Sequence, residues 1–101
     1  MDPRMIKQLQ QMQNKMVKAQ EDLANETVTA TSGGGAVTIE MNGHHEVKAV
    51  KIDPDAVDPS DISMLEDMVL TAFNDALDKA QELAQEKMGA ITGGLNIPGI
   101  F

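Results

Sequence analysis

The chain has 101 residues, no cysteine and a net charge of −8 at pH 7. Without cysteine there is no disulfide framework, thiol nucleophile or cysteine-ligated zinc site. The N-terminus lacks the apolar segment of a secretory signal, and no apolar run reaches the ~18 residues of a membrane span. We therefore expect a cytoplasmic protein without a membrane partner, folded as one domain over 1–101. Its few large apolar side chains, with two Phe and no Trp or Tyr, favour a core completed in a homodimer.

The charge is divided unevenly along the chain. Residues 1–20 carry four cations against Asp2, a net charge of +3, whereas residues 21–101 carry 15 acids against four lysines, a net charge of −11. The average charge argues against a nucleic-acid partner, but this distribution leaves one open and indicates that the first element would make the contact.

Residues 3–25 predict a long helix. Pro3 suits a first helical turn, where its missing N–H would be unpaired in any case. Apolar residues recur at spacings of 4, 3, 4, 3 and 4, a heptad pattern that predicts packing along the length of another helix. This seam comprises Met5, Leu9, Met12, Met16, Ala19 and Leu23. A helix of about 35 Å is expected to project beyond the core of so small a domain.

Residues 27–53 alternate with a period of two and predict a three-stranded antiparallel meander. A glycine-rich turn at 32–35 follows the first strand. Asn42-Gly43 indicates a hairpin between the second and third strands, because both residues tolerate positive φ. In a third strand at about 45–52, we expect Val50 and Ile52 on one face and Val47 and Ala49 on the other.

A second long helix is predicted over 60–91. Asp58 or Ser60 suits its N-cap and Pro59 its first turn. Its expected buried stripe comprises Leu65, Val69, Ala72, Phe73, Ala76, Ala80, Leu83 and Met88. Gly93-Gly94 would end the helix and leave residues 95–101 as a short apolar tail. The order is α-β-β-β-α, an α+β fold in which two long helices flank the sheet.

The sequence gives little support to an enzyme. His44 and His45 are adjacent near a strand start, so their side chains point to opposite faces and do not converge with Glu46 into an acid–base or metal site. No Gly-x-Ser-x-Gly elbow is present, and the glycine-rich turn precedes a strand instead of the helix that a phosphate loop requires. We expect no catalytic activity, no metal and no small-molecule substrate.

The face of the first helix opposite the seam is cationic and free of acids. Its residues recur at spacings of 3 and 4 over about 21 Å: Arg4, Lys7, Gln11, Asn14 and Lys18, with Lys15 beside them. Cations release counterions from a phosphate backbone, and amides hydrogen-bond to phosphates or base edges. Taken alone, this face is more typical of the solvated outside of a coiled-coil arm.

Several segments in order along the chain resemble the YbaB/EbfC family. They are Lys7-Gln8, Gln11-Met12-Gln13, Lys15-Met16, Met41-Asn42-Gly43, Val50-Lys51-Ile52-Asp53-Pro54, Met64-Leu65-Glu66-Asp67-Met68-Val69, Ala72-Phe73-Asn74-Asp75-Ala76, Glu86-Lys87-Met88, Thr92-Gly93-Gly94-Leu95 and Ile97-Pro98-Gly99. The resemblance implies a bacterial nucleoid-associated protein: a tweezer-shaped homodimer that binds DNA, alters its conformation, and affects nucleoid organisation and gene expression. It implies no cofactor.

Together these features favour a homodimer in the nucleoid that binds double-stranded DNA through the six polar residues of the first helix. The alternative from another class is an acidic protein-interaction or scaffold dimer without direct DNA binding. In that case the apolar seam of the first helix would be a docking groove for a partner helix.

Overall fold

A computed structural model of the chain describes residues 2–92 and has the predicted α-β-β-β-α order. The elements are α1 (Pro3–Asn25), β1 (Thr27–Ser32), β2 (Val37–Asn42), β3 (Val47–Ile52), a short 3₁₀ helix η1 (Pro54–Ala56) and α2 (Ile62–Thr92). The molecule is elongated, with principal extents of 69 × 25 × 15 Å. The predicted helix stop at Gly93-Gly94 and the tail at 95–101 lie outside the described residues.

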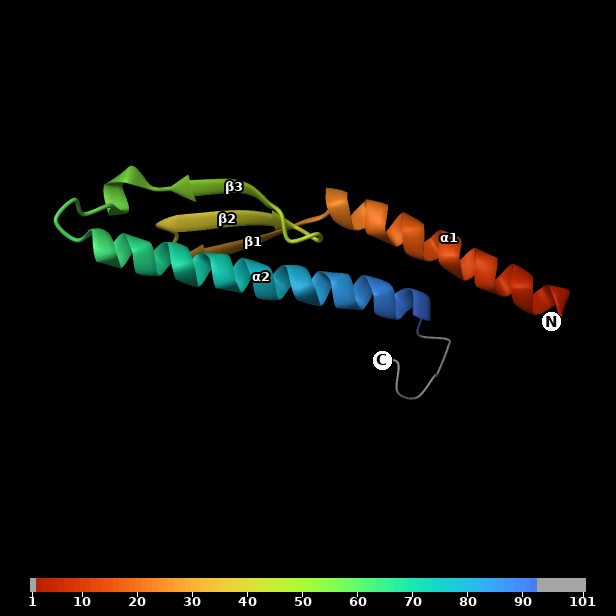
Figure 1. Cartoon of the computed structure of the whole chain (residues 1–101). Coiled ribbons are helices and arrows are strands. Elements are labelled where there is room, and N and C mark those ends of the chain that lie inside the picture. Colours follow the sequence, from red (N-terminus) through yellow and green to blue (C-terminus); the bar gives the residue numbers. More distant parts are fainter. Residues whose placement is uncertain (1, 93–101) are drawn as a thin grey trace.

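The antiparallel sheet has the strand order β1-β2-β3, and α2 runs along one of its faces (Figure 1). The helix lies mainly over β1 and β2. The centre of the core lies between β2 and α2, where the side chains are at most 1% exposed: Val37, Ile39 and Met41 from the strand, and Ala72, Ala76 and Ala80 from the helix. Because alanine has only a methyl group, the helix can approach the sheet closely.

The prediction that Phe73 belongs to the buried stripe of α2 was wrong, since this ring is 38% exposed. The three alanines face the sheet, and Leu65 and Val69 are partly buried against the same core. Phe73 follows Ala72 by one residue, about 100° around the helix, which places it on a flank that the narrow sheet leaves uncovered.

Val47 was also assigned to the wrong face of β3. Ile39 pairs with Val50 and Glu40 with Ala49, but Met41 then pairs with Val47, so the register shifts by one residue. Lys48 is the extra residue of this β-bulge, and it returns Val47 to the face that carries Val50 and Ile52. Val47, Val50 and Ile52 therefore share the face of the sheet that α2 covers, and Ala49 lies on the other face.

The second helix begins two residues later than predicted. The Asp61 carboxylate accepts a hydrogen bond from the Met64 N–H at 3.2 Å, so Asp61 is the N-cap and Ile62 the first helical residue. The Asp58 carboxylate instead accepts from the backbone N–H and hydroxyl of Ser60, at 2.9 and 2.6 Å. Asp58 thus stabilises a turn before the helix.

Both predicted turns of the meander are present. Gly33, Gly34 and Gly35 all have positive φ in the turn between β1 and β2. In the turn between β2 and β3, the residue with positive φ is His45, at 64°, and not Asn42 or Gly43. This turn is longer than a two-residue hairpin and spans the residues between Asn42 and Val47.

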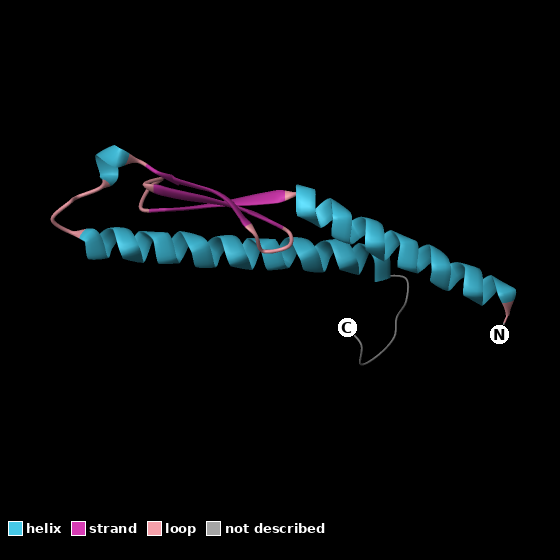
Figure 2. Ribbon diagram, turned by 45° about the horizontal axis from the view of Figure 1, so that its top comes forward, coloured by secondary structure: helices cyan, strands magenta, loops and turns pink. Residues whose placement is uncertain are grey.

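Among the described residues, the buried side chains of α1 lie at its C-terminal end. Ala19 and Leu23 are buried, whereas Met5 and Leu9 are each 54% exposed and Met16 is 37% exposed. The N-terminal half of α1 extends past the last turn of α2 in two views (Figures 1 and 2). Within residues 2–92 of one chain, the seam therefore does not pack along its whole length on another helix. We call residues 3–18 the arm.

Candidate nucleic-acid interface

The arm begins at a well-formed helix cap. The Asp2 carboxylate accepts a hydrogen bond from the Arg4 N–H at 2.9 Å, and Pro3 occupies the first turn. The one acid of the first twenty residues is therefore engaged with helix donors at the tip. From Pro3 to Gln20 the sequence contains no acid, so the arm has a net charge of +4.

All six residues predicted to contact DNA are exposed on α1: Arg4, Lys7, Gln11, Asn14, Lys15 and Lys18. We call them the cationic strip. Residues 2–92 form two ion pairs, and Lys87 is the cation in both. The four cations of the strip therefore have no carboxylate partner in that part of the chain. They are available to phosphates without breaking an internal ion pair.

The structure does not make the strip the only exposed face of the arm. Met5, Ile6, Leu9 and Val17 are also exposed on the same helix. Both the polar and the apolar faces of the arm are therefore exposed. Exposure does not distinguish the strip as a phosphate contact, whereas its grouped cations do.

Two ion pairs hold the base of α1 to α2. The Lys87 ammonium nitrogen lies 2.7 Å from a Glu26 carboxylate oxygen and 4.0 Å from an Asp22 oxygen. Partly exposed pairs of this kind contribute only about 0–1 kcal/mol to stability. Their electrostatic effect is to place a cation beside two of the acids nearest to the strip.

The turn after β2 makes a second attachment, which the sequence analysis missed. The Gly43 N–H donates to the Leu23 carbonyl at 2.9 Å and to the Glu26 carbonyl at 3.1 Å. The Asn42 amide donates to the Ala24 carbonyl at 3.1 Å, and a ring nitrogen of His44 lies 2.5 Å from the Gln20 carbonyl oxygen. We call Asn42, Gly43 and His44 the clasp.

One signal for the clasp was present in the sequence. A helix leaves its last carbonyls without partners, and many helices solve this with a glycine just past their end. Helix α1 ends with Asn25, followed by Glu26 and Thr27, and no glycine is nearby. Without such a glycine, partners for its carbonyls come from water or from another element, and Asn42 and Gly43 supply them for Leu23, Ala24 and Glu26.

The histidines do not form a catalytic pair. His44 is engaged with the Gln20 carbonyl, while His45 occupies a turn position with positive φ. Within residues 2–92, no group of three or more His, Asp or Glu side chains is arranged to hold a metal ion.

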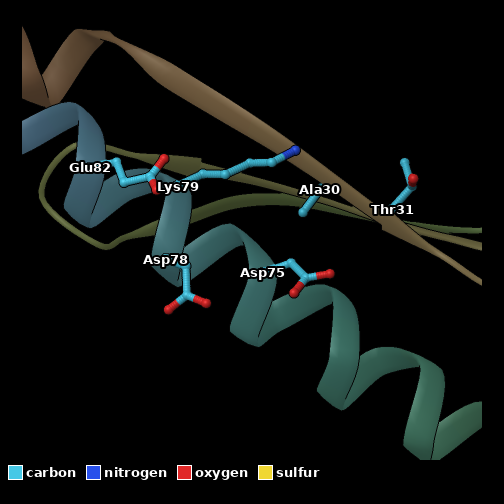
Figure 3. Close-up of a pocket in the computed structure, with 6 residues that line it drawn as sticks. All are labelled: Ala30, Thr31, Asp75, Asp78, Lys79 and Glu82. Carbon is cyan, nitrogen blue, oxygen red and sulfur yellow. The ribbon is translucent and has the colours of Figure 1, made fainter.

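The pocket shown in Figure 3, of about 320 Å³, lies between β1 and α2 and is strongly acidic. It is lined by Ala30, Thr31, Asp75, Asp78, Lys79 and Glu82. The Lys79 ammonium donates to the Thr29 carbonyl at 2.9 Å, so the one cation is bound to the edge of the sheet. Three carboxylates at this pocket repel phosphate, so the pocket is not part of a DNA contact made by the arm.

An acidic α+β body that carries an acid-free cationic arm is the architecture of a candidate nucleic-acid-binding protein. Comparison with known families specifies which one. The family model of the YbaB/EbfC DNA-binding family matches residues 1–95, so the chain belongs to this family.

Curated relatives match the chain over almost its whole length. A nucleoid-associated protein of Pelotomaculum thermopropionicum is 50% identical, over 97% of this chain and 93% of the relative. A nucleoid-associated protein of Chloroflexus aurantiacus is 52% identical, with both chains covered completely. Neither the family nor these relatives support the alternative of a scaffold without DNA binding.

A solved structure shows the same fold. An uncharacterized protein from Helicobacter pylori aligns with a TM-score of 0.72 at 24% identity, covering 85% of this chain and 91% of that one. In the part of the chain that the structure describes, no helix is long and apolar enough to cross a bilayer.

Proposed function

We propose that this protein binds double-stranded DNA in the bacterial nucleoid as a homodimer, with the cationic strip of each arm on the phosphate backbone. By bridging two stretches of backbone with two arms, it would alter DNA conformation, and so affect nucleoid organisation and gene expression. The observation that carries the proposal is an acid-free arm whose four cations have no carboxylate partner among residues 2–92, in a member of a DNA-binding family.

The spacing of the strip suits a phosphate backbone. Arg4 and Lys18 are separated by about 21 Å along the helix axis, roughly the length of six base pairs. Gln11 and Asn14 lie between them and supply hydrogen-bond donors. Contacts of this type fix a protein on the duplex without reading its sequence.

The rest of the molecule repels DNA. Residues 21–92 contain 15 acids and four lysines. At physiological salt, charges separated by more than about 8 Å are largely screened, so the protruding part of the arm escapes much of this repulsion. Binding is expected to be moderate in affinity and strongly dependent on salt.

A second copy fits the apolar surface that one chain leaves open. Val47, Val50 and Ile52 on β3 are exposed, although they lie on the face that α2 covers elsewhere. Lys79 reaches β1 from one flank of α2, so Phe73 and Leu70, on the other flank, lie on the side of β3.

This flank of α2 is part of a shallow groove of about 450 Å³, lined by Leu65, Glu66, Val69, Leu70 and Phe73. The groove and β3 together form an apolar surface with an open strand edge, which is a site for association in a small domain. A twofold axis would bring this surface against the same surface of a second copy.

The test is a gel mobility shift with duplex DNA between about 50 and 200 mM salt. With three strip cations on the outer face of each arm, six in a homodimer, the slope of log K against log salt should be about −4 to −6. Arg4→Ala combined with Lys7→Ala removes four of these charges per dimer and should weaken binding and flatten the slope by about 3 to 4.

The matched control is Lys48→Ala combined with Lys51→Ala, which removes the same charge from β3. We expect a smaller loss of affinity from this control, because both lysines lie on the acidic body. Equal effects from the two double variants, or an unchanged slope in the arm variant, would overturn the assignment of the contact to the arm. No shift for the unmodified protein at either salt would overturn DNA binding itself.

A further inference from the structure

The direction in which the arm leaves the body is fixed at a few points near one end of α1. Within the described residues, these are the buried side chains of Ala19 and Leu23, the Lys87 ion pairs, the contact between Gln20 and Met88, and the clasp. The clasp differs from the others because it binds backbone carbonyls of α1. It therefore constrains the helix axis and not only a side chain.

Each residue of the clasp engages a different part of the last turns of α1. His44 bonds to the carbonyl of Gln20, Gly43 to that of Leu23, and Asn42 to that of Ala24. Three bonds distributed around more than one helical turn resist tilting in more than one direction, which a single bond would not.

Asn42 is itself held firmly. Its side chain is fully buried, and its carbonyl oxygen accepts from the backbone N–H groups of His44 and Glu46 at 3.0 and 2.9 Å. Its amide also donates to the Glu46 carboxylate at 3.0 Å. The clasp is thus a rigid part of the turn after β2, and it transmits the orientation of the sheet to α1.

Gly43 is required here by close approach and not by its backbone angle. A Cβ atom at this position would lie 2.6 Å from the Leu23 Cδ2 atom and 2.9 Å from the Leu23 carbonyl oxygen. The carbonyl oxygen belongs to the helix backbone, so any side chain at residue 43 must displace the end of α1.

We infer that Asn42, Gly43 and His44 are positioning residues that set the direction of the arm and thereby the placement of its cations on DNA. This inference rests on the proposed DNA contact by the strip. Arg4 lies 19 residues from Leu23, about 28 Å along the helix. A tilt of roughly 20° at the clasp would move Arg4 by about 10 Å, more than the screening length of about 8 Å.

The experiment measures arm direction and DNA binding separately. The chain has no cysteine, so Gln8→Cys on the arm and Glu82→Cys on α2 provide two unique positions for spin labels. Labelled protein diluted into an excess of unlabelled protein gives the distance within one chain, by pulsed electron paramagnetic resonance. Duplex DNA affinity is measured by mobility shift on unlabelled protein with the same clasp substitutions.

Gly43→Ala should shift or broaden the distance distribution by several Å and lower DNA affinity by about five- to tenfold. His44→Ala should act in the same direction but less strongly. His44→Gln, which retains an N–H donor, should have a distance distribution and a DNA affinity close to those of the natural chain. Gly89→Ala is the matched control, because a Cβ there meets nothing within 4 Å, and it should change neither quantity.

An unchanged distance in both Gly43→Ala and His44→Ala would overturn the inference, whatever the DNA affinity. A changed distance with unchanged affinity would overturn the link between arm direction and binding. Failure of the proposed DNA contact is recognised independently, from an unchanged salt slope in the Arg4 and Lys7 variant. If Gly43→Ala does not fold by circular dichroism, the exposed His44 variants decide the outcome.

Discussion

Glu46 closes the turn that contains the clasp. Its carboxylate accepts from the Asn42 amide, and its backbone N–H donates to the Asn42 side-chain oxygen. The hydrogen bond from Asn42 is the main reason that the pKa of Glu46 lies below its ordinary value, and the positive charge of Lys48 lowers it further, against an opposing effect of desolvation and with a lesser lowering by His44. The charged carboxylate is therefore favoured in the folded protein.

The lowered pKa of Glu46 predicts how the turn responds to acid. A carboxyl group with a lowered pKa stabilises the folded state above its unfolded pKa, and this contribution is lost as the pH falls through the folded pKa. The stability gap between the natural chain and Glu46→Gln should therefore close on acidification. Carbonyl NMR titration should place the Glu46 midpoint below that of an unfolded peptide, and a midpoint at or above that of the peptide would contradict the role of Asn42.

Helix α2 contacts the sheet through a ridge of alanines. Ala72, Ala76 and Ala80 are fully buried, and β2 supplies the larger side chains on the other side of the contact. The distance between helix and sheet is therefore set by methyl groups. Such a contact has no room for additional atoms, because protein interiors are packed as densely as organic crystals.

This ridge predicts that enlarging its middle residue is destabilising. Ala76→Leu should lower the free energy of unfolding by about 1–3 kcal/mol through overpacking. The matched control, Ala90→Leu, makes the same change at an exposed position of α2 and should stay within about 0.5 kcal/mol. Urea unfolding followed by circular dichroism measures both, and equal effects would show that the ridge tolerates larger side chains.

The elements themselves could be predicted from local sequence, because their signals are local. The period of the first helix, the alternation of the strands and the glycine-rich turn gave the α-β-β-β-α order. Errors appeared where two elements meet. The bulge at Lys48 depends on pairing with β2, and the exposure of Phe73 depends on how much of α2 the narrow sheet covers.

The residues of the candidate site could be proposed from the sequence, but the contacts that attach their helix to the sheet could not. The acid-free spacing from Arg4 to Lys18 is a property of one helix and can be read directly. The clasp joins residues about 20 positions apart in the sequence, such as Leu23 and Gly43, and a hairpin signal does not reveal that its turn will cap another helix. The hydrogen bond between His44 and the Gln20 carbonyl was likewise not predicted from the sequence.

At the scale of the whole molecule, the cations of the strip, most of the acids and the apolar surface around β3 occupy different regions. The arm carries the cations, α2 carries many of the acids, and β3 with one flank of α2 carries exposed apolar side chains. The association of two copies through β3 would leave both arms and both acidic surfaces outside the contact.

This arrangement predicts that a charge on β3 prevents self-association. Val50 is 52% exposed, so Val50→Lys should be tolerated by the single chain but should place two like charges in the contact between copies. Sedimentation equilibrium should show a dimer for the natural chain and a large monomer fraction for the variant.

Thr31→Lys, which adds the same charge to an exposed position of β1, is the control and should remain a dimer. A variant at Val50 with unchanged mass would place the contact on another surface. A natural chain that sediments as a monomer would overturn the homodimer.

The Lys79 side chain has a consequence for stoichiometry. By donating to the Thr29 carbonyl, it occupies an acceptor on the outer edge of β1, and charged lysines at such edges discourage further strands. The sheet is therefore protected on one side and open at β3 on the other. A sheet with a single usable edge can be extended once, after which both outer edges are of the protected kind, so the proposed assembly through β3 would close at two copies and would not propagate into a filament.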